Sequence, residues 1–123
     1  MNLDAFSTTQ VDSLLELLVL GMYADGHLAD AEDRTIKEFA REGGVAPGYN
    51  LEQSLNKAIS SARQVDLNEA SLTGAVKRIA TVIDEPDVRQ SALDALVALH
   101  SSDADDAQSE IKFHKIVEEV FDL

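Results

Sequence analysis

Apolar residues recur with helical spacing along almost the whole chain, and this pattern is the strongest constraint on its fold. No segment keeps up the strict alternation of apolar and polar residues that a half-buried strand requires. The sequence therefore predicts an all-α protein, a compact single domain over residues 1–123 built from six or seven helices. The expected inward-facing residues are Val11, Leu14, Leu15, Leu18, Val19 and Met22; Ile36, Phe39 and Ala40; Leu51, Leu55, Ala58, Ile59 and Ala62; Leu72, Ala75, Val76, Ile79, Ala80 and Ile83; Val88, Ala92, Ala95, Leu96 and Leu99; and Phe113, Ile116, Val117 and Val120.

Capping and turn residues separate these periodic segments. A Ser, Thr, Asp or Asn three residues before a Glu, Gln or Asp is typical of a helix start. Proline is favoured in the first turn of a helix, and glycine at its end. We expect the second helix to end at Gly43-Gly44. The predicted start signals are Thr9 with Asp12, Asp30, Asn50 with Gln53, Asp66 with Glu69, and Pro86.

The charge balance of the chain limits its partners. There are 23 Asp and Glu residues against ten Lys and Arg, a net charge of −13, which disfavours both nucleic acid and anionic membrane surfaces. No cysteine is present, so a disulfide framework and a thiolate metal site are excluded. The densest apolar stretch, Leu14 to Met22, is interrupted by Glu16 and is too short to insert into a membrane. With no signal peptide at residues 1–10, we expect a cytoplasmic protein.

Two acidic pairs share one spacing, at corresponding places in the two ends of the chain. Glu32 follows Asp25 by seven residues, and Glu110 follows Asp103 by seven residues. Such a recurrence indicates a helix–loop–helix unit used twice. A shift of 78 positions superposes Leu15 on Leu93, Leu18 on Leu96, Val19 on Val97, Asp25 on Asp103, Ala29 on Ala107, Glu32 on Glu110 and Lys37 on Lys115.

The matched acids fall at predicted helix junctions, where carboxylates and free backbone carbonyls come together. Clustered oxygen ligands without cysteine suit a hard divalent cation, Ca²⁺ or Mg²⁺, better than a transition metal. Asp105 and Asp106 add acids to the second corner. Neither corner has the ligand spacing of an EF-hand. Helix capping and turn chemistry also explain each corner taken alone, and the cation interpretation gains from the spacing that the two corners share, so both interpretations stay open.

The acidic pairs carry a family resemblance. This small, acidic, helical chain resembles the TerB-like tellurite-resistance family. The resemblance lies in Leu18-Val19 followed by Ala24-Asp25-Gly26 and Glu32, and in the repetition of the acidic pair at Asp103 and Glu110. The resemblance covers about Leu14 to Phe121. It implies a helical bundle with two acidic sites, a role in tellurite and general stress resistance, and assembly with other resistance components, including membrane proteins. The implied metal ligands are Asp25, Glu32, Asp103 and Glu110.

The sequence favours a non-enzymatic binding module with a protein partner. It shows no nucleophile elbow, no glycine-rich phosphate loop and no set of catalytic residues. Two alternatives remain: a purely structural acidic interaction domain without metal, and a metal-dependent hydrolase. Of the histidines, His27 is expected to be solvated in a loop and His114 to pack near the inner face. Nothing in the sequence indicates an oligomeric state.

Overall fold

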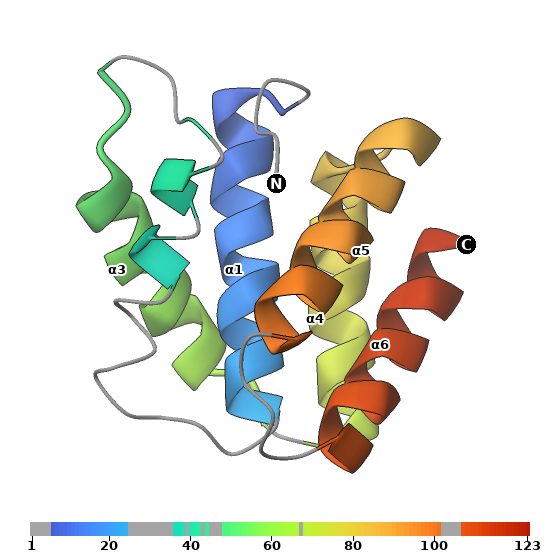
Figure 1. The fold of residues 1–123 in the computed structure, drawn as a ribbon. Helices are drawn as coiled ribbons and strands as arrows, with labels where there is room; N and C mark the ends of the chain where they lie inside the picture. The colour runs from blue at the N-terminus through green and yellow to red at the C-terminus, as the bar shows by residue number, and fades with distance from the viewer. Residues whose placement is uncertain are drawn as a thin grey trace.

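The computed structural model confirms the all-α prediction. Its helices are α1 (Thr8–Ala24), α3 (Leu51–Arg63), α4 (Glu69–Val82), α5 (Pro86–Ser101) and α6 (Ala107–Phe121), and residues 36–38 and 40–42 are also helical (Figure 1). The described residues hold no strand, and their six helices fall within the predicted six or seven. The structure describes residues 6–24, 36–38, 40–42, 44, 48–66, 68–101 and 107–123, without the side chains of residues 24, 99–101 and 107–110.

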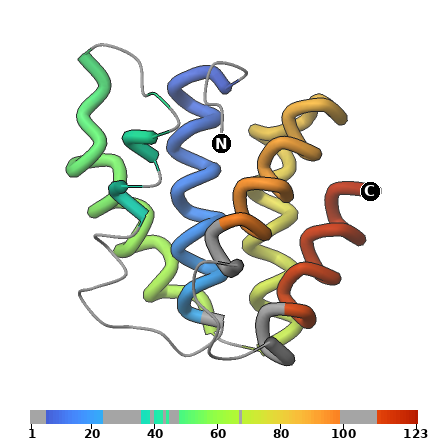
Figure 2. Tube along the Cα trace, viewed as in Figure 1, coloured from blue at the N-terminus to red at the C-terminus, as the bar shows by residue number. Residues whose placement is uncertain are grey.

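Helix α1 is the centre of the packing. It lies between α3 on one side and α4, α5 and α6 on the other, and it contacts all four (Figures 1 and 2). The predicted inner face of α1 is buried, but so are Leu17 and Leu20, which are 0% exposed and lie outside that face. The predicted buried face of α1 was therefore correct but incomplete. A helix that is apolar nearly all round is buried on several sides.

The N-terminal end of α1 uses a different cap from the predicted Thr9 with Asp12. The Ser7 hydroxyl accepts from the backbone N–H of Gln10 at 3.2 Å, and the Gln10 side chain accepts from the Ser7 N–H at 3.0 Å. This reciprocal pair is a capping box. Phe6 before the cap and Val11 after it are both buried, in the positions of a hydrophobic staple. The Gln10 amide also donates to the Val82 carbonyl at 3.3 Å, which ties α1 to the end of α4.

Asparagine side chains cap the next two helices. Asn50 accepts from the Gln53 N–H at 3.1 Å, so the predicted start of α3 is confirmed. The predicted start of α4 at Asp66 is wrong, because Asn68 accepts from the Ser71 N–H at 2.8 Å and the helix begins at Glu69. Asn68 has the extended backbone of a cap residue, and asparagine caps as well as aspartate does.

The predicted inner faces of the later helices largely match the core. The aliphatic residues expected to point inward in α3, α4 and α5 are buried, except that Ile59 is half-buried. In α6, Phe113 and Val117 are buried while Ile116 and Val120 pack against the core from its edge. Phe39 and the side chain of Leu99 lie outside the described residues. Within the described part of the chain, none of the helices combines the length and apolarity needed to cross a membrane.

Helix ends in the two halves of the chain correspond under the 78-residue shift. Thr8, the first residue of α1, falls on Pro86, the first residue of α5. Gly44 and Asp122, also 78 positions apart, both have positive φ, at 80° and 59°. Their N–H groups donate to equivalent carbonyls, Arg41 at 3.1 Å and Glu119 at 3.3 Å.

The corresponding helices nevertheless differ in burial. Val19 in α1 is 2% exposed, whereas its counterpart Val97 in α5 is 42% exposed. Helix α1 packs against all four other labelled helices, whereas the main neighbours of α5 among the described residues are α1 and α6. The correspondence under the 78-residue shift therefore applies to helix boundaries and not to burial. Burial differs because each helix has different neighbours.

Replacing Asp122 by glycine should stabilise the protein. The left-handed backbone at this position disfavours a side chain, and a negative charge is unfavourable at the C-terminal end of a helix. We expect Asp122→Gly to raise the free energy of unfolding by about 0.5–1 kcal/mol, measured by urea denaturation. Asp122→Ala is the control, since it removes the charge and keeps the Cβ. Equal stability of the two variants would contradict the backbone argument.

Candidate functional site

The predicted metal ligands lie mostly outside the described residues. Asp25, Glu32 and Asp103 are in this group, as are His27, Asp105 and Asp106. Glu110 lies in the first turn of α6, and its side chain is not described. The helix bounds show where two of these acids fall in the sequence. Asp25 directly follows Ala24, the last residue of α1, and Asp103 comes two residues after Ser101, the last residue of α5. Among the described residues, no three His, Asp or Glu side chains are placed to hold a metal ion.

Arg89 is the most connected polar side chain in the described structure. From the first turn of α5 it donates to the Ile83 carbonyl at 2.7 Å and to the Ala80 carbonyl at 2.9 Å, both at the end of α4. It also reaches the carbonyl of Phe121, the last residue of α6, at 3.5 Å, and its guanidinium lies 5.6 Å from the centre of that ring. One cation thus satisfies the free carbonyls of two helix ends, where a positive charge is favourable.

Tyr49 joins the segment before α3 to α1. Its hydroxyl donates a hydrogen bond to the carboxylate of Asp12. Burial and the bond to Asp12 raise the pKa of Tyr49 to about 12, against an opposing contribution from Ser54. The phenol therefore stays protonated and remains a donor throughout the physiological range. Asp12, which we expected to pair with Thr9 in a helix-start signal, instead accepts a hydrogen bond from the segment before α3.

Glu16 is a half-buried carboxylate within the most apolar helix. Burial raises its pKa above the ordinary value, and the positive charge of Arg78 on α4 opposes the shift. His114 on α6 is also half-buried; burial lowers its pKa, opposed by Glu118, so the imidazole is neutral at pH 7. Its partial burial agrees with the packing role expected for it.

Glu16→Gln should change the pH dependence of stability. Because the folded-state pKa is raised, the contribution of this carboxyl is fully present below its unfolded pKa, near 4.5, and is lost as pH rises through the folded value. The glutamine variant avoids that loss, so at pH 7 it should be more stable than the parent by about 0.5 kcal/mol. Denaturation at a series of pH values should show the advantage disappearing below about pH 4.

Exposed Glu38→Gln is the matched control, since it also removes one negative charge from an acidic protein. If both variants gain the same stability at pH 7, the gain comes from reduced net repulsion and the argument from the burial of Glu16 fails.

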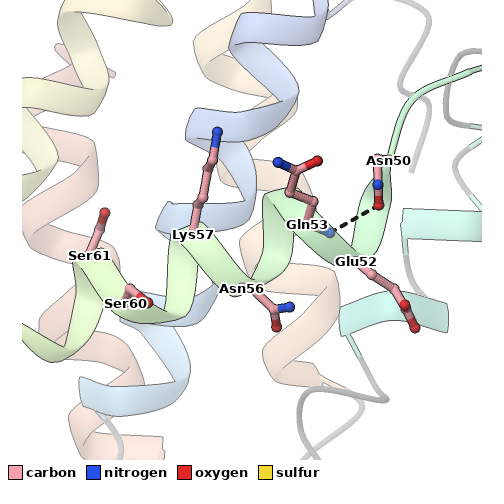
Figure 3. A pocket seen from close by; sticks show the side chains of 7 residues that line it. All are labelled: Asn50, Glu52, Gln53, Asn56, Lys57, Ser60 and Ser61. Carbon is pink, nitrogen blue, oxygen red and sulfur yellow. Dashed lines mark hydrogen bonds between the residues drawn. The ribbon is translucent and has the colours of Figure 1, made fainter.

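A surface hollow lies along α3, and the side chains that line it do not converge on one point. Figure 3 shows Gln53 and Lys57 pointing to one side of the helix, and Asn56 to the other. All of the lining residues come from α3 and its cap, and Lys37 contacts one of them, Glu52, at 3.4 Å. A hollow with diverging walls from one helix lacks the convergent polar groups of a ligand pocket. It is lined by Asn50, Glu52, Gln53, Asn56, Lys57, Ser60 and Ser61.

Exposed carboxylates lie on the α4–α5 turn, in the first turn of α5 and at the end of α6. Arg89 joins the turn to the end of α6 through its bonds to Ile83 and Phe121. We call this group the C-terminal acidic patch; it does not include any of the predicted metal ligands. Its members are Asp84, Glu85, Asp87, Glu118, Glu119 and Asp122, all exposed.

Comparison of the chain with protein-family models, with curated proteins and with solved structures finds no match. The TerB-like resemblance therefore rests on the sequence motifs, and membership of that family stays a prediction.

Proposed function

We propose that the protein is a non-enzymatic, cytoplasmic acidic module that binds divalent cations and a protein partner. The cations occupy two repeat-related corners, one with Asp25 and Glu32 and one with Asp103 and Glu110. The TerB-like resemblance suggests a role in tellurite or general stress resistance, with other resistance components, including membrane-associated ones, as partners.

The agreement of helix ends under the 78-residue shift is the observation that carries this proposal. Helices α1 and α5 begin at equivalent positions, and the helices that follow them end with equivalent hydrogen bonds at Gly44 and Asp122. The equal spacing of the acids is therefore accompanied by matched helix starts before the acids and matched terminal hydrogen bonds after them. This supports a common role for the two pairs.

Helix geometry adds an electrostatic reason for cation binding. Asp25 and Asp103 come one and two residues after the last described residues of α1 and α5. Near a helix C-terminus, unpaired carbonyls and the helix dipole favour positive charge. The net charge of −13 makes any bound cation more favourable by reducing repulsion. Carboxylate and carbonyl oxygens suit Ca²⁺, whose coordination number is flexible, somewhat better than Mg²⁺.

The described polar interior argues for a binding role over catalysis. Arg89 and Gln10 each bond from one helix to the end of another, and Tyr49 bonds from the segment before α3 to Asp12 of α1. Groups committed to holding the fold are unsuitable as general acids, bases or charge stabilisers, which must face a substrate. Exposed carboxylates are abundant among the described residues and are available to bind cations or a basic partner.

Calorimetric titration of the chelator-stripped protein tests the cation sites. We expect Ca²⁺ and Mg²⁺ to release or absorb heat, and millimolar Ca²⁺ to raise the melting temperature by several degrees through preferential binding to the folded state. The variant Asp25→Asn, Glu32→Gln, Asp103→Asn, Glu110→Gln should lose both effects.

A second variant with the same loss of charge is the control: Asp84→Asn, Glu85→Gln, Asp87→Asn, Glu118→Gln in the C-terminal acidic patch should keep binding. No heat and no thermal shift at millimolar cation would refute the proposal. Binding that survives the first variant would place the ion elsewhere.

An acidic interaction domain without metal is the second candidate. The C-terminal acidic patch favours it, because these carboxylates are additional to those expected to bind the cation. Its partner would be basic, and binding would weaken with salt while ignoring chelators. A metal-dependent hydrolase is less favoured; metal-dependent turnover lost on Asp25→Asn would support it.

A further inference from the structure

We draw no further inference here: the strongest candidate, the C-terminal acidic patch between the α4–α5 turn and the end of α6, is a cluster of exposed carboxylates beside which no feature of the described residues points to a ligand.

Discussion

Leu18→Ala should lower the free energy of unfolding by about 3–5 kcal/mol, the largest effect we expect from a single truncation. Leu18 is 0% exposed, and it lies on α1, which contacts every other labelled helix. Truncation to alanine forfeits the burial of an isopropyl group and leaves a cavity in the core between α1 and the helices that pack on it. Because those elements are held by other contacts as well, the cavity cannot collapse easily. Urea denaturation, with the slope checked for two-state behaviour, measures the change.

Leu123→Ala is the matched control, since it removes the same atoms from a leucine that is 45% exposed. It should change stability by less than about 0.5 kcal/mol. A loss below about 1 kcal/mol for Leu18→Ala would mean that α1 is not at the centre of the core.

Arg89→Ala should destabilise the protein by about 2–4 kcal/mol, because three carbonyls at two helix ends lose a charged donor together. The contact with the ring of Phe121 is lost in the same change. Lysine keeps the charge but has a single nitrogen, which cannot serve all three carbonyls in this geometry. Arg89→Lys should therefore restore only part of the loss. Thermal and urea denaturation of both variants measure the ranking.

Arg63→Ala provides the comparison, since Arg63 is exposed and makes one hydrogen bond of 3.3 Å to Tyr23. It should cost less than about 1 kcal/mol. Equal losses of stability at Arg63 and Arg89, or full rescue by Arg89→Lys, would contradict the prediction. Either result would show that the positive charge matters and that the three hydrogen bonds to carbonyls do not.

Local sequence rules predicted the helices well, because periodicity and capping act within a few residues. The start of α3 followed from Asn50 and Gln53, and the glycine at position 44 ends its helix as expected. The error at α4 arose because Asp66 and Asn68 are both good caps with a partner three residues on, and spacing alone does not rank them. The same ambiguity hid Ser7 behind Thr9 at the start of α1.

Contacts between distant segments were not predictable from the sequence. Arg89 and Phe121 are 32 residues apart, and Tyr49 and Asp12 are 37 apart. No spacing rule relates such residues, because the tertiary fold alone brings them together. Likewise, the burial of Leu17 and Leu20 depends on how many helices surround α1, which its own sequence does not specify. Cation binding at the two acidic corners stays a prediction, which calorimetric titration tests.

The central position of α1 has a consequence for synthesis on the ribosome. This helix ends at Ala24, yet the helices that cover it extend to Phe121, so its leucines emerge long before their partners. At about 5–20 residues per second, translation leaves Leu17, Leu18 and Leu20 without their full cover for roughly 5–20 seconds. An apolar helix exposed for that long is a binding site for chaperones and a point of aggregation. The helix at the centre of the folded core is therefore also a segment on which the nascent chain can aggregate until the later helices are made.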